Sequence, residues 1–175
     1  MYGRANNCRT TFLRGCFSVS LITVCFFCPG CSHTEMGSTV EEKEALEVLK
    51  RDYDCNDFEM DDKGRIIKVV LKRFHDDAIM DHICKFKMLK AINLGWSNVT
   101  DEGIKKLQGL KRLESLNIVW TPITDRGLAY LEEMTSLRFV TLSPSKQLTS
   151  IGIASLQNAI PGIRVFTAEK SRRKE

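Results

Sequence analysis

Residues 89–112 read LKAINLGWSNVTDEGIKKLQGLKR, and the next 24 residues, 113–136, read LESLNIVWTPITDRGLAYLEEMTS. The two blocks align without a gap and share seven identities, far more than chance supplies, so the chain repeats itself. Self-similarity at a period of about 20–50 residues is typical of solenoids, in which each coil buries its apolar side against its neighbours. The repeat therefore predicts an α/β architecture built from stacked coils.

Each repeat combines a strand-like part with a helix-like part. In Leu116-Asn117-Ile118 the alternation points the two apolar side chains inward and Asn117 outward. A Thr-Asp pair follows, and we expect its side-chain oxygens to bind the unpaired amides that open a short helix. A glycine in the first helical turn is expected where neighbouring coils approach too closely for a Cβ atom. The pairs are Thr100-Asp101 and Thr124-Asp125, and the glycines are Gly103, Gly127 and Gly152.

The repeats extend beyond these two blocks. A degenerate first repeat begins with a strand at 66–73, and a fourth unit at 137–162 leads into a last strand at 163–166. We therefore predict about four coils over residues 65–166, which is enough for a stable stack.

Residues 38–64 are predicted to cover the open end of the first coil. Overlapping capping boxes at 38–42 open a helix. The sequence Asp-Asp-Lys-Gly at 61–64 is typical of a hairpin turn in which Gly64 adopts a positive φ. A strand follows whose alternating apolar residues are Ile67, Val69 and Leu71.

The motif VTDEGIKKL, repeated as ITDRGLAYL, resembles the TDxGL class of leucine-rich repeats, the class of the GALA-type and cysteine-containing repeats. The recurring cysteine of the latter type is absent. Over residues 40–166 the chain is similar to the short leucine-rich repeat lipoproteins of the bacterial cell envelope. This resemblance implies an α/β leucine-rich repeat solenoid of about four coils with an N-terminal helix-hairpin cap. It also implies a non-enzymatic protein-binding role.

Residues 1–31 have the features of an export signal. Three arginines precede an uncharged apolar run at 15–28, which suits a signal peptide and is short for a membrane span of about 20 residues. The Gly30-Cys31 pair resembles a bacterial lipoprotein signal, with Cys31 as the lipidated first residue of the mature chain and 32–37 as a linker. The alternatives are ordinary cleavage, which gives a secreted protein, and retention of residues 15–28 as an anchor.

The mature chain carries little net charge. Of the 26 lysines and arginines, three lie in residues 1–31, which leaves 23 basic against 22 acidic residues. This balance gives no basic footprint for nucleic acid. The basic tail at 167–175 is expected to be a solvated chain end rather than a binding arm.

The cysteines do not indicate a metal cluster. Cys25, Cys28 and Cys31 are spaced like iron–sulfur ligands, but a glutamate occupies the fourth position and the segment belongs to the leader. Cys55 and Cys84 remain in the folded part. We expect them to be free thiols, with a disulfide between them as the alternative.

One histidine–aspartate cluster could hold a divalent metal: residues 75–77 read His-Asp-Asp, and 81–82 read Asp-His. These residues lie at the turn and helix start of the degenerate repeat, which favours a structural role with Asp76 or Asp77 as the helix N-cap. We therefore predict neither a metal nor a cofactor.

Trp96 and Trp120 occupy the same position in successive repeats, so we expect them to stack about 5 Å apart. Exposed tryptophans in series are typical of a partner surface, and the alternative is that they cover the edge of the core. Arg73 and Pro144 fall near the same row in the flanking units. The neighbouring concave residues are small and uncharged, which suits a peptide, a loop or a glycan better than a polyanion. The predicted partner-binding residues are Arg73, Asn93, Trp96, Asn117, Val119, Trp120 and Thr141.

The sequence thus predicts a lipid-anchored, non-enzymatic protein-interaction module of the bacterial cell envelope that faces the periplasm or the exterior. The alternative is a glycan-binding or structural envelope component that uses the Trp96/Trp120 row. No nucleophile motif or phosphate-binding loop occurs in the sequence.

Replacing Cys31 with serine tests the predicted anchor. We expect Cys31→Ser to move the protein from the membrane fraction to the soluble fraction, because the apolar run at 15–28 is short for a span. Fractionation followed by immunoblotting measures this. A variant that stays uncleaved in the membrane would show instead that residues 15–28 are the anchor.

Overall fold

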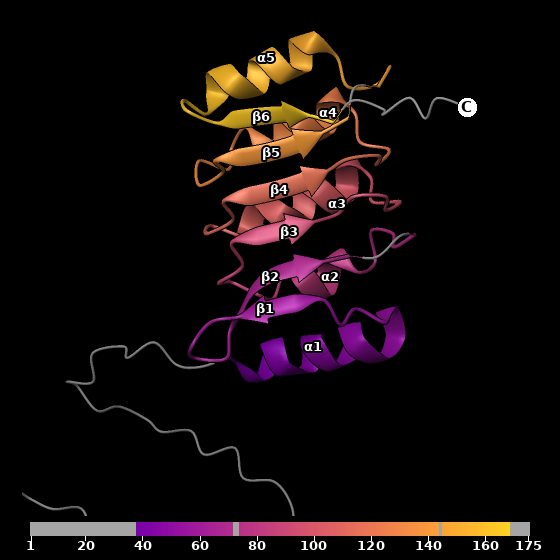
Figure 1. Ribbon diagram of the computed structural model, residues 1–175, viewed down its shortest axis with the longest axis vertical. Coiled ribbons are helices and arrows are strands. Elements are labelled where there is room, and N and C mark those ends of the chain that lie inside the picture. The colour runs from indigo at the N-terminus through magenta and orange to yellow at the C-terminus, as the bar shows by residue number, and fades with distance from the viewer. Residues whose placement is uncertain (1–37, 72–73, 144, 169–175) are drawn as a thin grey trace, which may run out of the picture. The chain divides into compact units, whose positions relative to one another are not determined.

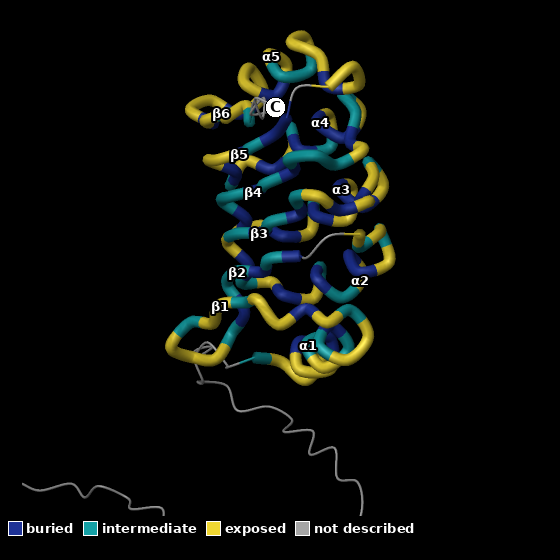
Figure 2. Tube along the Cα trace, turned by 45° about the vertical axis from the view of Figure 1, so that its right-hand side comes forward, coloured by how far each residue is buried: buried dark blue, intermediate teal, exposed yellow. Residues whose placement is uncertain are grey.

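The computed structural model describes residues 38–71, 74–143 and 145–168. The predicted signal peptide, Cys31, the 32–37 linker and most of the basic tail lie outside these residues. The described part is a two-layer solenoid: six strands form one sheet in chain order, and helices cover one face of it (Figures 1 and 2). β1 is antiparallel to β2, and the remaining strand pairs are parallel.

The elements alternate regularly after an N-terminal cap. The helices are α1 (Val40–Tyr53), α2 (Met80–Ile83), α3 (Asp101–Lys106), α4 (Asp125–Leu131) and α5 (Ser150–Ala159), with a 3-10 turn at Leu107–Gly109. The strands are β1 (Phe58–Met60), β2 (Ile66–Val70), β3 (Ala91–Asn93), β4 (Ser115–Ile118), β5 (Phe139–Leu142) and β6 (Arg164–Thr167). Four strand–helix coils followed by a last strand agree with the predicted solenoid.

The N-terminal cap forms around a reciprocal hydrogen-bonded pair. Thr39 Oγ1 accepts from the Glu42 amide at 3.2 Å, and Glu42 Oε2 accepts from the Thr39 amide at 3.1 Å. The hairpin turn places Gly64 at a φ of 73°. In β2, however, Ile66 is buried where we expected Ile67, because the pairing with β1 shifts register between Glu59 and Met60. Such a bulge changes which side chain meets the core.

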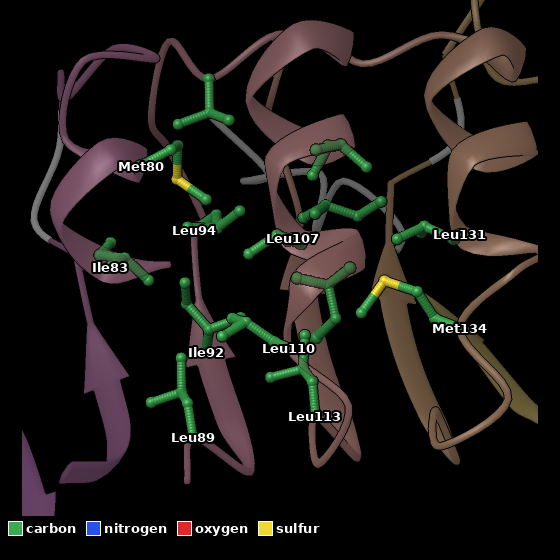
Figure 3. Close-up of a cluster of buried hydrophobic side chains, with 14 of the residues drawn as sticks. Met80, Ile83, Leu89, Ile92, Leu94, Leu107, Leu110, Leu113, Leu131 and Met134 are labelled. Carbon is green, nitrogen blue, oxygen red and sulfur yellow. The ribbon is translucent and has the colours of Figure 1, made fainter. Parts of the chain in front are cut away.

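The core runs between the sheet and the helices as one continuous stack. Ile92 pairs in register with Leu116, and Leu116 pairs with Val140, so each coil adds one inward residue to the same row. Leu107 and Leu131 close the row from the helical side, and both are fully buried (Figure 3). The 24-residue register predicted from the repeat is therefore the register of the core.

Aspartate side chains join each coil to the next. Asp101 accepts from the amide and from Oγ1 of Thr124, at 2.9 and 2.7 Å, and Asp125 accepts from the same two groups of Thr149, at 2.8 and 2.7 Å. Asp77 holds Thr100 in the same way. We call this series the carboxylate ladder. Because the acceptors are charged, each of its hydrogen bonds is among the stronger kind.

The ladder corrects one prediction. The threonines do cap their helices, since Thr124 Oγ1 accepts from the Arg126 amide at 3.2 Å. The aspartates that follow them do not cap the same helix, because their oxygens reach the next coil. Asp76 accepts from the amide of Ala78, but neither Asp76 nor Asp77 is the predicted N-cap of α2, because that position belongs to Ile79, which makes no side-chain capping bond.

The glycines of the helical first turns leave room for the ladder. A Cβ atom on Gly103, Gly127 or Gly152 would overlap the carboxylate of the preceding coil, which confirms the predicted crowding. At Gly152 the three nearest atoms all belong to Asp125.

Two further features concern cysteines and membrane spans. Cys55 and Cys84 form no disulfide within the described residues, in agreement with the preferred expectation; Cys55 is buried and Cys84 is partly buried. Over the described ranges, none of the helices combines the length and apolar character needed to cross a membrane.

A double-mutant cycle at Gly152 and Asp125 tests the ladder. We expect Gly152→Ala to lower the free energy of unfolding by about 1–3 kcal/mol, because the new methyl group displaces a carboxylate that makes two hydrogen bonds. In an Asp125→Ala background, the same change should cost little, since alanine is otherwise preferred over glycine in a helix by about 0.5–1 kcal/mol. Urea denaturation of the four proteins measures the coupling. Additive effects would contradict the ladder.

Candidate functional site

The face of the sheet that points away from the helices carries aligned rows of side chains. We call it the outer face. One row runs across five strands as Val70, Asn93, Asn117, Thr141 and Phe166, because these residues are register partners from β2 to β6. Neighbouring strands lie about 4.8 Å apart. The outer face therefore repeats similar chemistry at the spacing of the coils.

The two asparagines of this row present hydrogen-bond donors. Asn93 Oδ1 accepts from the Gly95 amide at 2.9 Å, and Asn117 Oδ1 accepts from the Val119 amide at 3.0 Å. These bonds fix the orientation of each side-chain amide and occupy its oxygen. The Nδ2 groups make no hydrogen bond to another described residue, so each asparagine offers N–H donors to a ligand.

An open groove of about 530 Å³ lies over this row. It is lined by Leu71, Asn93, Gly95, Trp96, Asn117, Val119, Thr141 and Ala168. Five of the residues predicted to bind a partner are among them, whereas Trp120 is not. Arg73 lies outside the described residues, as does Pro144. The lining holds no charged side chain. This agrees with the expectation from the sequence for the exposed strand residues, which lie on the outer face.

Aromatic residues follow the ends of three neighbouring strands, and one of them, Trp96, lines the groove. Phe74, Trp96 and Trp120 follow β2, β3 and β4, and all three have left-handed backbones, with φ of 74°, 64° and 57°. The main chain links successive coils here: the Phe74 amide donates to the Trp96 carbonyl at 3.2 Å, and the Trp96 amide donates to the Val119 carbonyl at 2.9 Å. We call these three residues the aromatic row.

The aromatic row includes one residue that the sequence analysis did not single out. Phe74 takes the left-handed position before that of Trp96, whereas the predicted Arg73 lies outside the described residues. Phe74 precedes Trp96 by 22 residues, whereas Leu71 precedes Leu94 by 23 and Asp77 precedes Asp101 by 24, so an alignment of the repeats does not bring Phe74 and Trp96 together. A search for aromatic residues just after each strand would have found Phe74.

The rings of the aromatic row are exposed to different degrees. The ring centroids of Trp96 and Trp120 lie 5.5 Å apart with an interplanar angle of 31°, close to the predicted spacing. Phe74 is 78% exposed and Trp96 is 51% exposed, while Trp120 is half-buried. A role in covering the edge of the core therefore explains the half-buried Trp120 ring in part, but it does not explain the exposed rings of Phe74 and Trp96.

A left-handed backbone is unfavourable for these residue types. An L-residue with a Cβ atom pays roughly 1–2 kcal/mol in this conformation, and glycine or asparagine is the usual occupant. Three bulky aromatic residues at three successive left-handed positions are therefore not the choice that backbone energetics favours. Strain of this kind is concentrated at functional sites.

The histidine–aspartate cluster serves structure. His75 and His82 both contact the ring of Tyr53, at centroid distances of 5.8 and 5.9 Å. Asp77 is held by Thr100 in the carboxylate ladder. Within the described part of the chain, no group of three or more histidine, cysteine or acidic side chains could hold a metal ion.

Cys84 is protected from reaction. Its Sγ donates to the carbonyl of Lys106 at 3.0 Å, and burial raises the pKa of the thiol to about 11. Because the thiolate is the reactive form, this cysteine is almost entirely protonated at neutral pH.

The comparisons with known proteins bear on the fold. The family model described as "Leucine Rich repeat" matches residues 87–107 and 111–131, which are the β3–α3 and β4–α4 coils. No curated protein matches the sequence. Among solved structures, an internalin from Listeria monocytogenes is similar, with 14% identity and a TM-score of 0.37. The similarity covers 78% of this chain and 52% of the internalin, so the chain spans about half the length of that protein.

Substitutions of Trp96 test whether its ring is needed for folding. Trp96→Ala loses the contact with Trp120, worth about 0.5–1.5 kcal/mol, and keeps the strained backbone. Trp96→Gly loses the same contact but relieves the strain. We therefore expect the glycine variant to be at least as stable as the alanine variant in thermal and urea denaturation. A clearly more stable alanine variant would contradict the left-handed assignment.

Proposed function

Because the chain folds as a leucine-rich repeat solenoid, we propose that it is a non-enzymatic module that holds a protein partner against the outer face of its sheet. Leucine-rich repeat domains generally mediate protein–protein interaction, since the strands of successive coils form an extended surface. The proposal places the contact at the groove and the aromatic row.

The left-handed aromatic row is the observation that carries this proposal. Glycine would fit the backbone of Phe74, Trp96 and Trp120 without strain. The aromatic side chains cost stability, and two of the three point into solvent. Exposed aromatic residues contribute strongly to binding when a partner covers them, because they combine a large apolar area with few rotatable bonds. Their occurrence in three consecutive coils supports a role in contact with a partner.

The chemistry of the groove supports a peptide-like occupant. The N–H donors of Asn93 and Asn117 match main-chain carbonyl oxygens, which every extended segment or loop displays. Trp96 stands beside these donors and gives an apolar contact for a side chain of the same segment. A highly charged partner finds no counter-charge in the groove lining.

We further propose that a lipid on Cys31 tethers the module to the bacterial cell envelope, with secretion as the alternative. The residues of the leader alone support this step. A tether would leave the outer face available to partners in the periplasm or at the cell exterior.

Capture experiments with fold-compatible variants test the proposed surface. The full chain is used as bait in a cell-envelope extract, and bound proteins are identified by mass spectrometry. We expect Trp96→Gly combined with Trp120→Gly to lose the captured partner, because removing an interface aromatic often costs more than about 2 kcal/mol. Lys105→Ala, on the exposed helical side, is the matched control and should retain it. Equal capture by both variants, or a captured glycan in place of a protein, would overturn the proposal.

A second variant tests the donors of the groove. Asn117→Asp keeps the oxygen that accepts from the Val119 amide and removes the Nδ2 donors. We expect at least tenfold weaker partner binding with an unchanged far-ultraviolet circular dichroism spectrum. Unchanged affinity would show that the asparagine row does not contact the partner.

A further inference from the structure

The last described strand has one open edge. The amides of Arg164 and Ala168 donate to β5-side carbonyls, those of Arg138 and Leu142, each at 2.8 Å. Hydrogen-bonding direction alternates along a strand, so the main-chain groups of Val165 and Thr167 point to the opposite side. No described residue pairs with β6 on that side. The edge therefore presents two residues with free donors and acceptors.

The two edges of the sheet are built differently. β1, at the other edge, has only three residues, and its pairing with β2 contains a register shift. A short edge strand with an irregular pairing to its neighbour is less suited to pairing with other chains. β6 has four residues in continuous register with β5. Only the β6 edge has the regular geometry that accepts another strand.

The core is also less complete at this end. Val165 stands in register with Val140, and Ile153 occupies the helix position of Leu128. Val140 and Leu128 are fully buried, whereas Val165 and Ile153 are only partly buried. The last coil thus leaves apolar surface that a further strand would cover.

An aromatic stack on the outer face leads to the same edge. The rings of Phe139 and Phe166 stack at 6.5 Å with an interplanar angle of 18°, and the Arg164 guanidinium lies 5.8 Å from the Phe139 centroid. Phe166 is 51% exposed. The stack ends at Phe166 on the open strand, with an uncovered ring.

We infer that a second copy of this chain pairs with β6 in antiparallel orientation, with the two-fold axis at Phe166. Val165 of each copy then lies opposite Thr167 of the other, and each such pair exchanges two main-chain hydrogen bonds. Phe166 lies opposite its own counterpart as a non-hydrogen-bonded pair, in which side chains approach most closely. The stack of Phe139 and Phe166 continues into the stack of the second copy.

Self-complementarity favours a second copy over an unrelated strand. In this register Arg164 lies opposite Ala168, so no like charges face each other across the strands. Outward residues pair with outward residues, which joins the outer faces of both copies into one surface. The contact is small compared with stable interfaces, which bury about 1,200–2,000 Å². We therefore expect a weak dimer whose population rises with protein concentration.

Disulfide trapping of the full chain tests the register. Opposed residues of a non-hydrogen-bonded pair have Cα atoms about 4.5 Å apart, within the range of about 4.4–6.8 Å that a disulfide spans. We expect Phe166→Cys to cross-link under mild oxidation, so that tryptic peptide 165–170 is recovered linked to itself. Arg164→Cys is the matched control. It lies on the same strand and face but opposite position 168, and its peptide 147–170 should not self-link. The peptide-level readout separates these products from those of the native cysteines.

The outcomes decide the inference. Self-linking at 166 and not at 164 supports it. Equal linking at both positions indicates random collision. Self-linking of Val165→Cys in preference to Phe166→Cys indicates another register. The absence of linking at any position shows that the edge does not pair with a second copy. Each of these three results overturns the pairing.

Sedimentation velocity gives an independent check of the dimer. The Phe166→Asp variant should be monomeric at all concentrations. The Ile151→Asp variant, which changes an exposed apolar residue of α5, is the control and should retain the concentration-dependent dimer.

Discussion

The hydrogen bonds between an aspartate of one coil and a threonine of the next are the contact on which the rest of the solenoid depends. Each such threonine also accepts from an amide of its own helix, as Thr124 does from Arg126. One hydroxyl therefore joins the start of a helix to the stacking of coils. Because each carboxylate holds two groups of the same threonine, it fixes both the spacing and the rotation of the next coil. The rows of the outer face follow from that alignment.

Much of this fold is readable from local sequence because its unit is short and repeated. The alternation around Leu116 and its counterpart Ile92 predicts which residues face the core, and both are buried as expected. The capping box of Thr39 and Glu42 and the turn at Gly64 depend on residues within a few positions of one another. Patterns of this range are decided by backbone geometry alone.

The errors have a common physical origin, which is that the deciding contact lies a full coil away or depends on loop length. A Thr-Asp pair predicts a local cap, and nothing nearby reveals that Asp101 binds a threonine 23 residues later. Ile66 replaces Ile67 in the core because Ile67 is an extra, unpaired residue of β2 between the partners of Glu59 and Met60. Phe74 joins the aromatic row through a loop of different length. Of the candidate site, the sequence could therefore supply the residues within regular repeats but not those in the degenerate one.

In the carboxylate ladder each aspartate binds the threonine of the following coil, and the series ends at α5. Ser150 stands where the earlier coils carry an aspartate, so α5 offers no carboxylate that could accept from two groups of a following threonine. A coil duplicated inside the array, by contrast, keeps both its own aspartate and the threonine that the preceding coil binds. Internal duplication of a coil therefore preserves every hydrogen-bonded Asp–Thr pair of the carboxylate ladder. A coil added after α5 would be held in the same way only if position 150 carried an acid.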